Sequence, residues 1–234
     1  MMFLDSAIDA HLYEQVNASR RDVAGRKRWR ASLIGSCLRA QYLTEQGVAG
    51  LPIDARTARI FEVGHLTGRM VEGWFKDMGI LLGAEVPFAD DDLNLGAHAD
   101  FIVKHEGSIV GLELKSKSSK SFWWAAKKNE TVAGHNQLLQ AAACALLAER
   151  ADYHVDYWQV MSISKDDLSI QLDDVTGAHM QEVIERCAQL NAATSHLDLP
   201  CDCFEVFGGK GWKWCKFGID ESTCCDPEAM GRVA

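Results

Sequence analysis

The sequence predicts an α/β fold in which helices flank a mixed β-sheet, and two observations carry this prediction. Periodic segments follow the order helix, three strands, helix, strand, which is typical of a sheet covered by helices. The chain has 234 residues and is 47% hydrophobic, enough for one substantial core. We therefore expect a single domain over residues 1–234, with a helical and basic region at 1–53, a core at 54–173, and a helix and cysteine-rich tail at 174–234.

The helices are predicted from apolar spacing and from residues that favour helix ends. The longest helical pattern covers 54–78, where Asp54 is expected as the N-cap and Gly79 as the stop. The alanine-rich segment 134–149 favours a helix by propensity. Further helices are expected over 5–20, the second half of 32–47, and 174–191.

The strands are predicted from short apolar runs between turn residues. Three runs follow the longest helix directly, and two more surround the turn "SKDD" as a hairpin. The expected strands are 80–88, 95–105, 108–116, 153–163 and 167–173.

The charge of the chain is uneven. A formal net charge of −9 argues against a protein that coats nucleic acid. However, residues 19–30 hold six basic residues and one acid, and residues 115–129 hold five lysines and no acid. These runs are either a basic groove for a polyanion or ordinary solvated faces. No apolar stretch is long enough to span a membrane and no secretory signal is visible, so we expect a cytoplasmic protein without a membrane partner.

The stretch "GLELKSK" places an acid and a lysine on one face of a strand. Glu113 and Lys115 are two residues apart, so alternation puts them on the same side. A tight hairpin that pairs His105 with Ser108 brings Asp100 opposite Glu113 in the same register. Facing carboxylates repel, so this arrangement favours a divalent cation such as Mg²⁺. The alternative is an inert pair of charges on a solvated strand.

The segments "GAHADFIV" and "GLELKSKS" resemble the D…(D/E)-x-K signature of the PD-(D/E)XK nuclease superfamily, without the proline that names the motif. Over residues 32–225 the order of elements is similar to that of the superfamily core. The RecB-like exonucleases, including CRISPR-associated and phage homologues, are the most similar branch. The resemblance implies that Asp100, Glu113 and the carbonyl of Leu114 hold Mg²⁺ or Mn²⁺, and that Lys115 is the catalytic lysine.

The resemblance also points to the helix before the strands, where it is imperfect. RecB-like nucleases often carry a glycine followed four residues later by a His or Glu that reaches the metal. Here Gly64 is followed by Gly68. His65 or Glu72, which flank Gly68 on one helical face, would substitute as the metal ligand. Alternatively, both are solvated surface groups.

A Gln-x-x-x-Tyr motif is typical of the family on the helix after the catalytic strand. This sequence offers Gln140, with Cys144 in the tyrosine position, and Gln137 one turn earlier. A glutamine there would position the scissile phosphate or the lysine. In the alternative interpretation, both glutamines are polar edges of an alanine-rich core helix.

Eight cysteines in a chain expected to be cytoplasmic indicate metal ligands or buried thiols before disulfides. The segment "SLIGSCLRAQYL" resembles the first cysteine of the iron–sulfur RecB-like nucleases. Four thiolates suit a [4Fe–4S] cluster or Zn²⁺, and we favour the cluster. Cys144 and Cys187 are expected in the core. The candidate ligands are Cys37 and, in the tail, Cys201, Cys203, Cys215, Cys224 and Cys225.

The lysines after the catalytic strand predict a track for DNA, because lysines follow phosphates and aromatic rings stack on exposed bases. Trp123 and Trp124 lie among these lysines, and at least one of them is expected to pack in the core. The expected DNA contacts are Arg39, Lys117, Lys120, Trp123, Lys127 and Lys128.

The sequence thus predicts a metal-dependent DNA exonuclease, a hydrolase acting on single-stranded or frayed ends in recombination, repair or phage DNA metabolism. An endonuclease of the same superfamily is one alternative. Another is a non-catalytic, metal-stapled subunit that binds DNA or assembles a complex. The expected partners are DNA and either a second copy of the chain or a recombination protein.

Overall fold

The computed structural model describes residues 4–19, 28–48, 50–128 and 130–200, which belong to two compact units. The larger unit holds Arg28–Gly35 and Gly64–Asn191. The smaller unit takes Met1–Lys27, Ser36–Val63 and Ala192–Ala234. Compact units need not fold independently, so the single nuclease domain stays a prediction.

The smaller unit contains helices α1 (Leu4–Ser19) and α3 (Leu38–Glu45), the first turns of α4 (Ala55–Asp77), and a short 3₁₀ helix, η2 (His196–Asp198). The side chain of Asn17 joins α1 to the segment before α4. Its amide donates to the carbonyl of Ile53 at 3.0 Å and accepts the Ile53 N–H at 3.0 Å. An ion pair between Asp9 of α1 and Arg59 of α4 joins these two helices.

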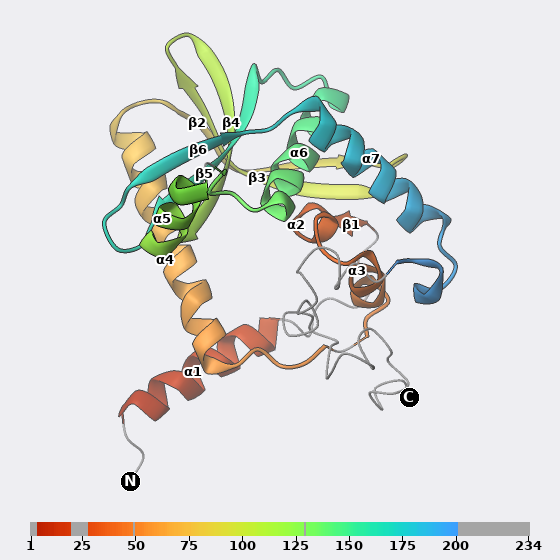
Figure 1. Cartoon of the computed structure of the whole chain (residues 1–234), viewed down its shortest axis with the longest axis horizontal. Helices are drawn as coiled ribbons and strands as arrows, with labels where there is room; N and C mark the ends of the chain where they lie inside the picture. The colour runs from red at the N-terminus through yellow and green to blue at the C-terminus, as the bar shows by residue number, and fades with distance from the viewer. Residues whose placement is uncertain (1–3, 20–27, 49, 129, 201–234) are drawn as a thin grey trace. The chain divides into compact units, whose positions relative to one another are not determined.

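The larger unit is built on a mixed six-stranded sheet flanked by helices, which confirms the predicted architecture at this level (Figure 1). The strand order is β1-β3-β4-β5-β6, and β2 also pairs with β3. The β1–β3 and β4–β5 pairs are parallel, and the other pairs are antiparallel. The strands are β1 (Trp29–Arg30), β2 (Leu81–Asp90), β3 (Leu95–His105), β4 (Ser108–Lys117), β5 (Tyr157–Ser164) and β6 (Ile170–Asp174).

Strand alternation sorts the side chains of β4 and β5 between the two faces of this sheet. On one face, Val71 and Phe75 of α4 pack in a cluster with apolar residues of β3, β4 and β5, and Phe75 meets Phe101 edge to face at 5.3 Å. The other face carries Val160, which packs on Leu138 of α6 (His135–Arg150). The even residues 112 and 114 face α4, so Glu113 and Lys115 face α6.

Small residues let α6 lie close to its neighbours. Five alanines of this helix are buried. At its start, a Cβ on Gly35, which follows α2 (Ala31–Ile34), would lie 2.5 Å from the Cα of Asn136. Only glycine fits such an approach of two backbones. The start of α6 is therefore fixed against α2, and its next turns reach over β4.

The register predicted for the β3–β4 hairpin is confirmed along most of its length. His105 pairs with Ser108, and the same register continues to Phe101 and Leu112. There the ladder ends, so the predicted backbone pairing of Asp100 with Glu113 does not form. Instead the two strands separate, and a side chain of β3 reaches across the opening. We call this opening the β3–β4 fork.

Several elements differ from the prediction. The two-residue β1, the 3₁₀ helix η2 and helix α5 (Ser119–Lys128) were not expected. The segment of α5 is rich in lysine and aromatic residues, and it forms an amphipathic helix that buries Ala125. Helix α7 (Gly177–Ala192) and the β5–β6 hairpin lie close to their predicted positions. Among the described helices, none combines the length and the apolar character that a membrane span requires.

Candidate active site

The β3–β4 fork holds two carboxylates. Asp100 Oδ2 accepts the backbone N–H of Leu114 at 2.7 Å, in place of a ladder hydrogen bond. Glu113 is 1% exposed. Its Oε2 has no hydrogen-bond partner among the described residues. A buried, unpaired carboxylate oxygen is costly, so this atom needs a proton or a cation.

Burial and mutual repulsion perturb the titration of both carboxylates. Burial, reinforced by the charge of Asp100, raises the pKa of Glu113 from 4.5 to about 8. Burial also raises the pKa of Asp100, although the N–H of Leu114 opposes this shift. Without a cation, the pair therefore holds a proton at neutral pH. A divalent cation would replace that proton.

Lys115 is fixed at the fork by two partners. Its Nζ lies 2.6 Å from Glu113 Oε1 and 3.1 Å from Gln140 Oε1. Gln140 projects from α6, so the helix and the strand hold the ammonium between them. The structure thus brings together three side chains that the sequence singled out, and it places the Gln140 amide on Lys115.

A second lysine and glutamine repeat this arrangement nearer the start of α6. Lys117 Nζ donates to Gln137 Oε1 at 2.6 Å, and the same oxygen accepts the N–H of Gly134 at 3.0 Å. Partial burial, and then the charge of Lys115, lowers the pKa of Lys117. Two ammonium groups therefore line the same face of β4.

The two candidate metal ligands on α4 have different surroundings. Glu72 is half-buried and forms an ion pair with Lys76 at 2.6 Å. His65 is exposed. Both residues act electrostatically on Glu85 of β2, as do Asp100 and His98.

Glu85 is the residue that the sequence interpretation missed. Its neighbours Ala84 and Val86 pair with Phe101 and Ala99, so Glu85 lies across from Asp100 on the next strand. Its backbone has a φ of 50°, which is unusual for a residue other than glycine. Burial first, and then the charge of Asp100, raises the pKa of Glu85. An acid inside the apolar run "LLGAEVPF" was the signal that could have identified it.

The helix that follows β4 displays aromatic rings to solvent. Trp123 is 55% exposed and Trp124 is 42% exposed, so the expectation that one of them packs in the core is wrong. The two rings meet edge to face at 4.7 Å. Lys127 Nζ lies 5.0 Å and 5.3 Å from the two ring centroids, within the range of cation–π attraction. Lys120 and Lys128 are exposed on the same helix.

The donor set at the fork fits a hard divalent cation. Within the ranges that the structure describes, no group of three or more His, Cys, Asp and Glu side chains is arranged to hold a metal ion. Mg²⁺ needs fewer, because it commonly binds through one or two carboxylates and keeps several waters. Asp100 and Glu113 supply two carboxylates, and the carbonyl of Leu114 belongs to the same strand.

The predicted cysteine site falls largely outside the described residues. Cys37 is buried in the smaller unit, but residues 201–234 and their five cysteines are not described. In the same unit, the guanidinium of Arg39 donates to the carbonyl of Leu199 at 2.8 Å. Cys144 and Cys187 lie in the core, as predicted. Burial raises the pKa of the Cys187 thiol to about 12.

The fork and its surrounding sheet define the class of this chain as a mixed α/β protein with helices on the sheet. No family model matches the chain, and no curated protein does. Among solved structures, the crystal structure of SSO0001 matches with a TM-score of 0.55 and 12% identity. The match covers 94% of this chain and 97% of that one. At this identity the likeness shows the fold alone.

Proposed function

We propose that the protein is a Mg²⁺- or Mn²⁺-dependent deoxyribonuclease of the PD-(D/E)XK type, similar to the RecB-like exonucleases. It hydrolyses phosphodiester bonds in single-stranded or frayed DNA, in recombination, repair or phage DNA metabolism. The observation that carries the proposal is the buried Glu113 beside Asp100, with Lys115 held between Glu113 and Gln140.

The carboxylates of Asp100 and Glu113, with the carbonyl of Leu114, would hold the metal. When bound, a divalent cation supplies a Lewis acid that activates a water and offsets phosphate charge. Asp100 also keeps its hydrogen bond to the Leu114 N–H, which orients that carboxylate. His65 and Glu72 remain proposed additional ligands from α4.

Lys115 contributes a positive charge at the point where the attacked phosphate becomes more negative. The water loses a proton as its oxygen bonds to phosphorus, the bond from phosphorus to the leaving sugar oxygen breaks, and that oxygen takes up a proton from solvent. An ammonium aimed at the phosphate stabilises this charge without reorganisation. Gln140 keeps the ammonium in place, since its Oε1 accepts a hydrogen bond from Nζ.

The substrate strand would leave the fork along the lysines of β4 and α5. Lys117 is next on the same strand face, and the tryptophan pair with Lys127 follows on α5. Bases stack on exposed indoles and phosphates meet ammonium groups, which suits an unpaired strand. Lys120, Lys128 and Arg39 remain proposed further contacts to DNA.

The cysteine site remains part of the proposal. Cys37 and the tail cysteines would hold a [4Fe–4S] cluster or Zn²⁺ as a structural staple. An ultraviolet–visible spectrum and metal analysis of anaerobically purified protein test this independently of nuclease activity. A protein with neither iron nor zinc contradicts it.

The function is tested with purified protein and labelled linear single-stranded DNA, in Mg²⁺, in Mn²⁺ and in EDTA. We expect degradation only with metal, and loss of degradation in Glu113→Gln and Lys115→Ala. Glu106→Gln, in the exposed turn of the hairpin, is the control and should remain active. A circular substrate separates an endonuclease from an exonuclease.

Two results contradict the proposal. Full activity in both Glu113→Gln and Lys115→Ala would place the chemistry elsewhere. DNA binding without cleavage in any divalent metal would instead support a non-catalytic DNA-binding subunit. Gly68 and Cys144, which differ from the RecB-like pattern, make this second outcome a specific alternative.

A further inference from the structure

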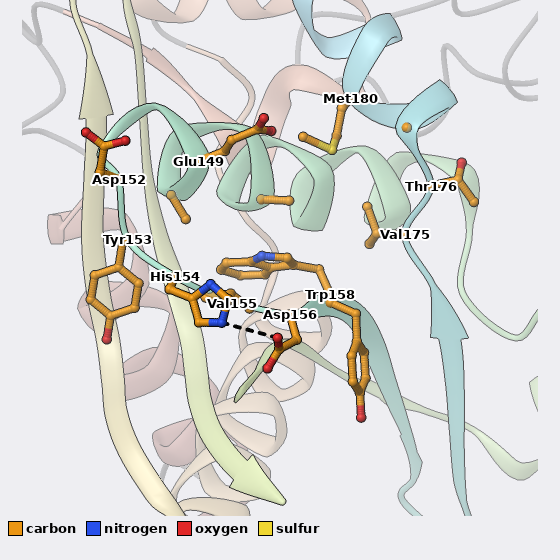
Figure 2. Close-up of a pocket in the computed structure, with 14 residues that line it drawn as sticks. Glu149, Asp152, Tyr153, His154, Val155, Asp156, Trp158, Val175, Thr176 and Met180 are labelled. Carbon is orange, nitrogen blue, oxygen red and sulfur yellow. Dashed lines mark ion pairs between the residues drawn. The ribbon is translucent and has the colours of Figure 1, made fainter. Parts of the chain in front are cut away.

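The larger unit contains a cavity of about 510 Å³ that none of the candidate catalytic residues lines (Figure 2). It lies beside the C-terminal end of α6, the first residues of β5 and the start of α7. Its volume is within the range of about 300–1,000 Å³ that is common for ligand sites. The fork lies near the opposite end of α6, where Gln140 meets Lys115.

The floor of this cavity is apolar and rigidly supported. Trp158 is only 7% exposed, and it lies so close over Gly111 that a Cβ there would be 2.3 Å from the indole. Phe88 contacts both Trp158 and Tyr153 edge to face, at 6.4 Å and 5.4 Å. Met180 adds an apolar side chain from α7. These contacts fix the indole of Trp158, of which only a small part is exposed, at the floor of the cavity.

The indole of Trp158 also carries a polar group. Its Nε1–H donates no hydrogen bond to a described residue, and it is not one of the buried polar atoms that lack a partner, so solvent reaches it. Figure 2 shows the indole among the residues that line the cavity. A ligand with a carbonyl oxygen would satisfy this donor.

The rim of the cavity is acidic. Glu149, Asp152 and Asp156 line it, and none of its fourteen lining residues is Lys or Arg. Asp156 pairs with His154 at 3.2 Å. Glu149 and Asp152 form no ion pair with any described residue. The C-terminal end of α6 adds partial negative charge, and the N-terminal end of α7 nearby adds partial positive charge. The three carboxylates carry more charge than this one helix end.

We propose that this cavity binds an arginine or lysine side chain presented by an exposed segment of a partner protein. The cationic group meets the acidic rim and the aromatic floor, where cation–π attraction adds to ion pairing. The carbonyl of the partner's backbone accepts the indole N–H of Trp158. The same charges repel phosphate, so we expect this cavity not to bind nucleic acid. This inference does not depend on the proposed nuclease activity.

The test follows the indole N–H signal of Trp158 by ¹H–¹⁵N NMR in metal-free protein. The chain has seven tryptophans, and the signal is assigned with Trp158→Phe. The probe is the capped peptide Gly-Arg-Gly, and the same peptide with citrulline is its uncharged counterpart. We expect a saturable shift of this signal with the arginine peptide, at a dissociation constant on the order of 1 mM.

Paired variants separate binding in the cavity from general attraction to an acidic protein. Glu149→Gln combined with Asp152→Asn should weaken binding on the order of fivefold, because both rim charges are removed. Glu106→Gln removes an exposed charge elsewhere and should leave affinity unchanged. Glu113→Gln should also leave it unchanged, whatever its effect on DNA cleavage.

Three results overturn the inference. The Trp158 signal does not move at tenfold higher peptide concentration, or it moves equally with the citrulline peptide, or the double variant binds as tightly as the original protein. Because the assay contains neither DNA nor divalent metal, its failure is distinct from failure of the proposed nuclease.

Discussion

The two ends of α6 lie beside different sets of charged groups: lysines held by a carboxylate and by glutamines near one end, and an acidic rim near the other. Near the N-terminus, which carries partial positive charge, Gln137 and Gln140 hold Lys117 and Lys115. The acidic rim of the cavity surrounds the C-terminal end, which carries partial negative charge. At the C-terminal end, the acidic rim and the helix dipole have the same sign, so this end favours a cation.

The two ends also differ in how far their charges are paired. At the N-terminal end, ion pairing and glutamine hydrogen bonds fix each ammonium. At the C-terminal end, Arg150 is the basic residue of the last turn, and it pairs with Asp90 at 3.1 Å. The chemistry proposed for the first end needs fixed groups, whereas the docking proposed for the second end needs charges that are free to pair with a ligand.

The largest expected effect is on DNA cleavage, and it distinguishes the two ends of α6. Asp100→Asn keeps an oxygen that accepts the Leu114 N–H but removes a negative charge from the fork. DNA cleavage should fall on the order of 10³-fold, and stabilisation by Mn²⁺ in thermal unfolding should disappear. Asp152→Asn, at the other end of α6, should change neither measurement. Equal losses in both variants would remove the distinction between the ends.

A second effect concerns stability and pH in protein kept free of metal. The pKa of Glu113 is about 8 in the folded chain, against an ordinary value of 4.5. The folded state therefore holds a proton that the unfolded state releases between these values, and the free energy of unfolding should fall as pH rises through this window. We expect a loss on the order of 2–4 kcal/mol.

The comparison for this pH effect is Glu113→Gln, which cannot release the proton. Urea unfolding between pH 5 and pH 8 in EDTA should show a much flatter dependence in this variant. It should also be more stable than the original protein at pH 8. An identical pH dependence in the two proteins would contradict the assignment.

A third effect tests the floor of the cavity. In Gly111→Ala, the added methyl group would collide with the ring of Trp158, so we expect a loss of about 1–3 kcal/mol in the free energy of unfolding. Gly73→Ala is the matched control, because a Cβ there meets no atom within 4 Å and the site is helical. The control should gain up to about 1 kcal/mol. Urea unfolding measures both.

The smallest effect separates the two glutamines. Gln140→Ala should lower the rate of DNA cleavage on the order of tenfold, because Lys115 loses one of its two partners. The Michaelis constant for DNA should change little. Gln137→Ala should instead weaken DNA binding with a smaller loss in rate, because Gln137 holds Lys117, which lies on the proposed path of the DNA strand. The reverse pattern would exchange the roles of the two lysines.

The sequence predicted the parts of the site that follow from local rules. Strand period and the tight turn were enough to place Asp100, Glu113 and Lys115 on neighbouring strands, and helical spacing was enough to present Gln140. The predicted register holds as far as Phe101 and Leu112. These features depend on residues that are close in the chain or joined by a short hairpin.

The features that could not be predicted depend on tertiary packing. The position of Glu85 follows from pairing of β2 with β3 and from an unusual backbone angle. The cavity assembles α6, β5 and α7, and no short motif encodes it. The exposure of the tryptophan pair also escaped prediction, since composition does not show that Lys127 packs over both rings.

The β3–β4 fork also links the site mechanically to a distant turn. The two strands pair from His105 and Ser108 at the turn to Phe101 and Leu112, and beyond these residues the pairing ends. Because side chains alternate, one residue inserted at the turn would rotate Glu113 away from its face while leaving the apolar faces mismatched. We therefore expect the length of this solvent-exposed turn to decide which face of β4 presents Glu113.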